Sequence, residues 1–282
     1  GCFRCGSTAV SMHPAAFGID AVSVCVHAGI LCRCGVIMLS NYQKALKYLY
    51  SFVDYEKLPG AAPEERTLDL IEGLLQALDH PERKWPSVHV TGTKGKGSTA
   101  TMIASIVQRE GYRVGLYTSP HMVSYRERMM VDGRKIPKKV FCRLIDEMRP
   151  VLDAFVRDSA EPPSFFDVWT ALAFLYFTAC RVDLAVVEVG LGGRLDSTNV
   201  LMPEASVITP IGLDHTDRLG TTLTEIAGEK AGIIKQEIPT IVAPQEPEAL
   251  IVIQDTCLAQ NSALVQVGAD LCYEIHHADR NR

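Results

Sequence analysis

A glycine-rich segment with two lysines, TGTKGKGST at residues 91–99, lies between a β-branched run and an apolar helical pattern. In the order strand, glycine-rich turn, lysine and helix, successive backbone N–H groups point inward, and the helix N-terminus adds a positive dipole end. Glycines let the backbone approach a phosphate closely, and a lysine at the turn-to-helix junction can reach the β- and γ-phosphates. The segment therefore predicts a nucleotide-binding loop. Its candidate residues are Gly92, Thr93, Lys94, Gly95, Lys96, Gly97, Ser98 and Thr99.

Gly97 stands where the usual nucleotide-binding loop carries a Ser or Thr hydroxyl that ligates Mg²⁺. A magnesium ion would therefore need ligands from elsewhere in the chain. Polar side chains follow three predicted strands, at the carboxyl edge where open α/β sheets bind ligands. Each of the three sets has a structural alternative to metal binding: a Ser-Pro turn for the first, a buried salt bridge for the second and a polar loop for the third. The candidates are Ser119 and His121 after one strand, Glu188 within the second, and Asp214, His215 and Asp217 after the third.

Lys230 lies on the apolar stripe of its predicted helix, four residues after Ile226 and three to four before Ile233 and Ile234. Burial lowers the pKa of a lysine and makes the neutral amine available. A neutral amine could react with CO₂ to form a carbamate, an anion able to bind magnesium. The spacing equally allows a lysine that snorkels to solvent or pairs with a carboxylate.

Helical and strand patterns alternate along most of the chain, and the strands are rich in Val and Ile on both faces. This pattern predicts an α/β fold with a mostly parallel sheet covered by helices on both sides. In helix 98–111 we expect Met102, Ile103, Ile106 and Val107 to form the buried stripe. The expected strands are 87–92, 112–119, 182–190, 205–212 and 238–243, and the expected helices are 42–53, 66–78, 98–111, 137–156, 164–180, 222–235 and 246–260.

The bulk composition is that of an ordinary soluble protein of 282 residues, with a formal charge of −5 that gives no case for nucleic-acid binding. Residues 1–37 hold five of the nine cysteines and are expected to be a poorly structured extension before a domain at 38–282. Because Cys2 and Cys5 have no second pair at finger-like spacing, we do not expect zinc there. The apolar run 21–39 is interrupted by charge, so we expect no membrane role and a cytoplasmic protein with reduced thiols.

Five motifs in order resemble the folylpolyglutamate synthase/dihydrofolate synthase family, within the wider group of Mur-type amide-forming ligases. They cover most of the chain from about residue 41 to about residue 248. The motifs are HVTGTKGKGST, TSPHMVSYRERMMVDG, DLAVVEVGLGGRLDSTNV, ITPIGLDHTDRLG and EIAGEKAGIIKQ.

The resemblance implies an ATP- and Mg²⁺-dependent ligase that adds L-glutamate to dihydropteroate or to tetrahydrofolate and its polyglutamates. ATP would phosphorylate the pterin-linked carboxylate, and the amino group of glutamate would attack the acyl phosphate. The implied partners are these small molecules alone, bound by a monomer, without nucleic acid or membrane. By motif match, the loop from Gly92 to Ser98 holds the phosphates. The implied catalytic residues are Lys96, Lys230 (the carbamylated lysine) and His215, the metal ligands are Ser119, Glu188 and His215, and the substrate residues are Pro120, His121, Arg126, Arg128, Arg194, Asp196 and Asn199.

The sequence departs from the family pattern in two ways. Lys94 stands where many bacterial members have Asn, and the DGAHNP-type motif of the second, C-terminal domain is absent. We therefore expect an N-terminal fragment that is inactive as a ligase by itself. The alternatives are a non-catalytic nucleotide-binding fragment and a peptidoglycan-precursor ligase of the Mur group. Gly97 argues against the latter, and against a P-loop kinase or GTPase, because those proteins have a hydroxyl at this position.

Overall fold

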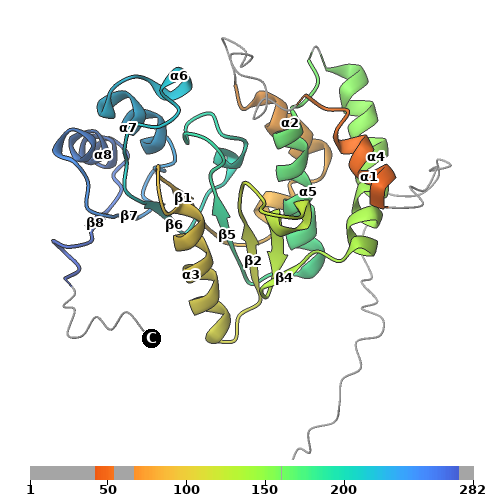
Figure 1. Ribbon diagram of the computed structural model, residues 1–282, viewed down its shortest axis with the longest axis horizontal. Helices are drawn as coiled ribbons and strands as arrows, with labels where there is room; N and C mark the ends of the chain where they lie inside the picture. Colours follow the sequence, from red (N-terminus) through yellow and green to blue (C-terminus); the bar gives the residue numbers. More distant parts are fainter. Residues whose placement is uncertain (1–41, 54–66, 160, 273–282) are drawn as a thin grey trace, which may run out of the picture. The chain divides into compact units, whose positions relative to one another are not determined.

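Eight strands organise the part of the chain that the computed structural model describes, which comprises residues 42–53, 67–159 and 161–272 (Figure 1). The expected extension at 1–37 lies outside these residues. None of the helices within these ranges has the length and apolar character needed to cross a membrane. The strands are β1 (Ser87–Thr91), β2 (Val114–Tyr117), β3 (Met129–Val131), β4 (Arg134–Lys135), β5 (Leu184–Glu188), β6 (Ala205–Ile208), β7 (Thr240–Val242) and β8 (Leu264–Gln266).

The strands form one sheet in the order β4-β3-β2-β5-β1-β6-β7-β8. The neighbours from β2 to β8 pair in parallel, which confirms the predicted class, and β3 and β4 add an antiparallel edge. The sequence patterns did not predict β3, β4 or β8. These strands have two or three residues each, too few for a periodicity to be recognised.

Helices follow most of the parallel strands, as a crossover connection requires. Several helices end earlier than the apolar pattern suggested, because the pattern continues into C-terminal turns. These turns keep some backbone hydrogen bonds, such as that from the Tyr50 N–H to the Leu46 carbonyl at 2.9 Å, but are not regular helix. The α-helices are α1 (Tyr42–Leu49), α2 (Asp69–Ala77), α3 (Lys96–Arg109), α4 (Lys138–Asp158), α5 (Phe165–Cys180), α6 (Thr216–Leu219), α7 (Leu223–Ala231) and α8 (Pro247–Ala259), and the 3₁₀ helices are η1 (Pro81–Arg83), η2 (Tyr125–Arg128) and η3 (Ser197–Val200).

Helix α3 packs on the sheet through Ala100 and Ala104 and through half of the predicted stripe, since Ile103 and Val107 are partly buried in the same cluster. Ala100 and Ala104 are buried against strand residues that include Val90. Met102 and Ile106 are 58% and 63% exposed, so their predicted burial is wrong. Alanines let the helix approach the sheet closely, and Met102 and Ile106 are left at its flank. The opposite face of the sheet packs against two clusters, one built largely from α1, α2, α4 and α5 and the other from α7 and α8.

The register of β1 decides which groups meet at the carboxyl edge of the sheet. Val90 of β1 lies beside Glu188, the last residue of β5. On the other side, Thr91 lies beside Ile208, the last residue of β6. The three strands therefore end together, and the loops that follow them emerge at one place.

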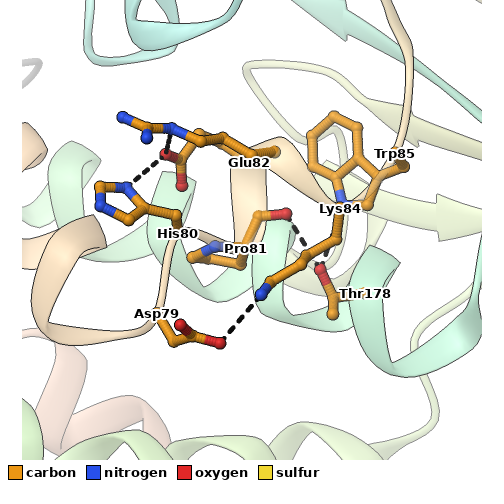
Figure 2. A network of polar contacts seen from close by, with 8 residues as sticks. Asp79, His80, Pro81, Glu82, Lys84, Trp85 and Thr178 are labelled. Carbon is orange, nitrogen blue, oxygen red and sulfur yellow. Dashed lines mark hydrogen bonds and ion pairs between the residues drawn. The ribbon is translucent and has the colours of Figure 1, made fainter.

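The amino end of β1 is anchored by a polar turn (Figure 2). The Thr178 hydroxyl of α5 accepts from Trp85 Nε1 at 3.2 Å and donates to the Pro81 carbonyl at 3.1 Å. In the same turn, His80 Nδ1 lies 2.9 Å from the buried Glu82 carboxylate. These contacts fix the start of the strand whose other end carries the glycine-rich loop.

Candidate active site

The glycine-rich loop leaves β1 in a conformation that requires glycine at two positions. Gly92 has a φ of 142°, and a Cβ there would lie 1.9 Å from Thr209 Oγ1. Gly95 is left-handed, with a φ of 84°, and serves as the N-cap of α3. No side chain caps this helix, so its first N–H groups remain available to an anion. The geometry is that of a phosphate-binding loop, with Lys96 as the first helical residue.

The loop is held by the segment that follows β6. The backbone N–H groups of Thr93 and Lys94 donate to the Pro210 carbonyl at 3.0 and 3.3 Å. The Thr93 hydroxyl donates to the Gly212 carbonyl at 3.1 Å and accepts the Gly212 N–H at 3.0 Å. Because these bonds join two loops at the carboxyl edge, the phosphate-binding geometry exists before any ligand binds.

Glu188 is a buried carboxylate facing the start of α3. Its Oε2 accepts the Ser119 N–H at 3.0 Å. A Cβ on Gly97 would lie 3.2 Å from the same oxygen, so the absence of a side chain there leaves room for the carboxylate. Desolvation raises the pKa of Glu188, against lowering by the Ser119 N–H and by the Lys96 charge. A buried carboxylate in this state gains stability from a nearby cation.

Lys230 reaches the glycine-rich loop from α7. Its Nζ donates to the Gly92 carbonyl at 2.8 Å, and the side chain is buried. Burial, followed by repulsion from Lys96, lowers the pKa of Lys230 from 10.5 to about 8. A large fraction of the amine is therefore neutral slightly above neutral pH, as the spacing on the helix had suggested.

His215 lies on the loop after β6, at the start of α6. Its side chain is 56% exposed, and its Nε2 is 4.0 Å from Asp214 Oδ1. Within the described ranges, no three His, Cys, Asp or Glu side chains gather closely enough to hold a metal ion. The structure therefore brings Ser119 and Glu188 together and leaves His215 on the adjacent loop.

The loop 119–128 presents predicted substrate residues in mixed environments. Arg128 is buried, and its Nε donates to His121 Nδ1 at 3.2 Å. The His121 ring packs against Tyr125 with ring centroids 3.9 Å apart. Arg126 donates to the Ile136 carbonyl at 3.0 Å, and Pro120 is exposed.

Glu127 organises this loop, although sequence reasoning did not select it. Its carboxylate accepts the backbone N–H groups of Met122, Val123 and Ser124 at 2.9, 3.2 and 3.1 Å. It also binds Lys135 Nζ at 2.8 Å, and the Lys135 hydrogen bond is the main cause of the fall in the pKa of Glu127 to about 2. The Ser-x-x-Glu spacing of a capping box is the signal that could have identified it.

The segment 190–199 turns its polar side chains inward. Asp196 accepts the Leu191 N–H at 2.9 Å and the Thr198 N–H at 3.0 Å, which caps η3. Arg194 is exposed and bonds to Glu229 Oε1 of α7 at 2.7 Å. Asn199 is 5% exposed, and its amide donates to two backbone carbonyls. Asp196 therefore folds the segment on itself, whereas Arg194 and Asn199 hold it against α7 and its C-cap.

Curated relatives match the chain over most of its length. It is 43% identical over 218 residues to the dihydrofolate synthase/folylpolyglutamate synthase of Bacillus subtilis, covering 77% of this chain and 49% of that protein. It is 39% identical to a folylpolyglutamate synthase of Arabidopsis thaliana, covering 77% of this chain and 36% of that protein. The chain belongs to the folylpolyglutamate synthase/dihydrofolate synthase family. No protein-family model matches the sequence.

Solved structures of the family share the fold. A folylpolyglutamate synthase (FPGS)–AMPPCP–folate complex is 38% identical, with a TM-score of 0.75, and covers 81% of this chain and 54% of that one. The folylpolyglutamate synthase of Thermotoga maritima is 38% identical, with a TM-score of 0.72, covering 81% and 50% respectively. These relatives support the folate family over a peptidoglycan-precursor ligase. The chain spans about half the length of the Bacillus subtilis protein and of these solved structures, and 36% of the Arabidopsis thaliana protein.

Proposed function

We propose that this chain is the ATP-binding part of a ligase that adds L-glutamate to dihydropteroate, to tetrahydrofolate and its polyglutamates, or to both. The observation that carries the proposal is the meeting of Lys96, Glu188 and Lys230 at the preformed glycine-rich loop. Cations and a carboxylate around an anion-binding loop suit phosphoryl transfer, in which the protein mainly positions and neutralises charge.

The loop and Lys96 would bind the ATP phosphates. The uncapped N-terminus of α3 supplies N–H donors, and Lys96 supplies a charge at the same place. The pterin-linked carboxylate would attack the γ-phosphorus, and ADP would leave. Attack by the glutamate amino group on the resulting acyl phosphate would form the amide and release phosphate.

Magnesium fits the donors that the chain offers at this edge. Mg²⁺ prefers oxygen ligands and is commonly held by one or two carboxylates together with phosphates and water. The buried Glu188 carboxylate and the Ser119 side chain supply such oxygens from adjacent strand ends. Bound there, the ion would neutralise phosphate charge. His215, whose side chain is exposed on the loop after β6, would be the third ligand.

Lys230 would act as a second charge-bearing group. Its buried amine, with a pKa of about 8, is nucleophilic toward CO₂ at slightly alkaline pH. The ammonium group first gives up one proton, and the neutral amine then attacks CO₂, forms an N–C bond and releases a second proton. The loss of two protons in all converts a cation beside Gly92 into a carbamate anion. We propose this modification because a buried anion there would complement Mg²⁺, as Glu188 does.

The folate substrate would lie along the loop 119–128 and beside the segment 190–199. Pro120 and His121 reach the surface of the first loop, and the charged groups of Arg126 and Arg128 lie near them. The FPGS–AMPPCP–folate complex of a similar chain supports folate as the class of substrate. Four cysteines in the described residues are free thiols, which supports a cytoplasmic location.

The chain by itself is proposed to bind nucleotide without completing ligation, since it covers only 49% of the length of the Bacillus subtilis relative. The test measures binding of an ATP analogue to the purified chain, together with folate- and glutamate-dependent ADP release. We expect analogue binding and no ADP release. Absence of binding would contradict the phosphate site, and glutamate incorporation would contradict the view that further chain is needed.

A further inference from the structure

Helix α7 and the segment 190–199 are in direct backbone contact around Lys230. A Cβ on Gly193 would lie 2.8 Å from the Glu229 carbonyl oxygen. A Cβ on Gly232, the C-cap of α7, would lie 2.5 Å from the Arg194 Cα. The contact has no room for even a methyl group, so a small shift of either partner moves the other.

Asn199 joins the two sides of this contact with one side chain. Its Nδ2 donates to the Arg194 carbonyl and to the Gly232 carbonyl, both at 3.0 Å. The backbone carbonyl of Asn199 accepts a hydrogen bond from Lys235 Nζ at 2.8 Å. Lys235 lies just beyond the end of α7. The last carbonyls of a helix lack intrahelical partners, so the bond to the Gly232 carbonyl also satisfies the end of α7.

Lys230 lies two residues before Gly232, and its Nζ bonds to the Gly92 carbonyl of the phosphate-binding loop. We propose that Asn199 is a positioning residue that acts through Lys230: its two amide hydrogen bonds hold the end of α7 so that the Lys230 amine stays at the phosphate-binding loop. The importance of the Lys230 amine for ligation rests on the proposed function. The location of the amine at the loop can be tested without catalysis.

The test follows the accessibility of the Lys230 amine. The chain and its variants are briefly acetylated with a small amine-reactive reagent, and mass spectrometry gives the extent of modification at each lysine. In Asn199→Ala, we expect modification of Lys230 to rise about tenfold, as fits the loss of one or two hydrogen bonds. Modification of the distant Lys84 should not change.

Asn199→Asp separates hydrogen bonding from packing. The variant keeps the size and shape of the side chain but places a carboxylate against two carbonyl oxygens. A positioning role through the amide donors predicts a rise at Lys230 at least as large as in Asn199→Ala. A role in packing alone predicts a smaller rise, and that result would overturn the proposal.

Ser197→Ala is the matched control within the same turn. Ser197 is fully buried, and its hydroxyl bonds to Asp167 of α5 rather than to α7. We expect Lys230 modification in this variant to equal that of the wild type. An equal rise in the control would show general loosening of the segment and would overturn the proposal.

If Asn199→Ala does not fold, Lys235→Met gives a milder change. Methionine keeps the packing of the stem and removes only the bond to the Asn199 carbonyl, so a smaller rise at Lys230 is expected. Wild-type modification of Lys230 in a folded Asn199→Ala variant would refute the positioning role. If that variant does not fold, wild-type modification in Asn199→Asp would refute it. Failure of the wild-type chain to bind an ATP analogue would contradict the proposed function, whereas the modification ratio decides the role of Asn199 separately.

Discussion

A buried carboxylate and a lysine lie near a turn at each end of β1. The charged groups have different partners at the two ends. At the amino end, Glu82 lies within 3.2 Å of both His80 Nδ1 and Arg83 Nε, and Lys84 pairs with Asp79 at 2.9 Å. At the carboxyl end, Glu188 accepts one backbone N–H, and Lys230 donates to a backbone carbonyl. Within the described ranges, neither of these two forms an ion pair.

The difference separates a structural turn from a site prepared for a ligand. At the amino end, opposite charges pair and anchor the strand, with both contacts of Glu82 made through Oε1 (Figure 2). Its Oε2 is buried and has no hydrogen-bond partner among the described residues. At the carboxyl end, burial raises the pKa of Glu188 and lowers that of Lys230, so each charged form is unfavourable in the free protein. Groups whose pKa values are shifted in this way gain the most stabilisation of their charged forms when phosphates and a cation bind beside them.

The largest expected effect concerns Lys230 and pH. Its pKa falls from 10.5 to about 8 on folding, so the folded state loses the proton first, and stability should rise as pH increases between these values. Relative to Lys230→Met, the wild-type free energy of unfolding should rise by up to about 3 kcal/mol across this window. Chemical denaturation at a series of pH values measures it. A constant difference would contradict the lowered pKa.

Lys96 should contribute strongly to phosphate binding. Lys96→Ala is expected to weaken binding of an ATP analogue about 10- to 100-fold, because a charge-assisted contact to phosphate is lost. Isothermal titration calorimetry measures the change. Lys84→Ala, at the other end of β1, removes only an exposed ion pair and should leave the affinity unchanged. If Lys96→Ala and Lys84→Ala weakened analogue binding equally, the two ends of β1 would not differ in their role in phosphate binding.

Replacing each buried carboxylate by its amide should change stability in opposite directions. Glu188→Gln should stabilise the free chain at neutral pH by on the order of 1 kcal/mol, since an unfavourable buried charge is removed. The gain should shrink as pH falls toward the usual carboxyl range, because the raised pKa of Glu188 makes its protonated form favourable there.

Glu82→Gln should instead destabilise the chain, because His80 and Arg83 lose their carboxylate partner. Thermal denaturation of both variants at two pH values tests the pair. Destabilisation by both changes would mean that Glu188 is as well compensated as Glu82.

The smallest expected effect is at Gly97. In Gly97→Ala, the new Cβ would lie 3.2 Å from Glu188 Oε2, so the carboxylate must shift by a few tenths of an ångström. Alanine also favours the helix, which offsets part of the cost, and we expect a change in stability below about 1 kcal/mol. Affinity for the ATP analogue with magnesium should fall a few-fold. Calorimetry with and without magnesium measures this, and a gain in affinity would contradict the role of Gly97 as space for Glu188.

The glycine-rich loop could be predicted from the sequence because its chemistry is local. Glycines and Lys96 between a strand and a helix define the loop conformation over a few residues. The alternation of Val/Ile strands with helices likewise predicted the parallel sheet. Half of the stripe on α3 was predicted wrongly. Ile103 and Val107 pack on the sheet as expected. Periodicity did not tell whether Ala100 and Ala104 or the larger Met102 and Ile106 face the sheet.

The sequence by itself determined the α/β class, the phosphate-binding loop and the polar residues at the strand ends. Only the tertiary structure decided which of them meet, because strand order and register place β5 beside β1 and bring α7 over the loop. That arrangement joins Glu188 to Ser119 and Lys230 to Gly92, and it leaves His215 exposed. It also turns Asn199 inward, onto the carbonyl of Gly232, a contact between residues 33 positions apart that no local pattern encodes.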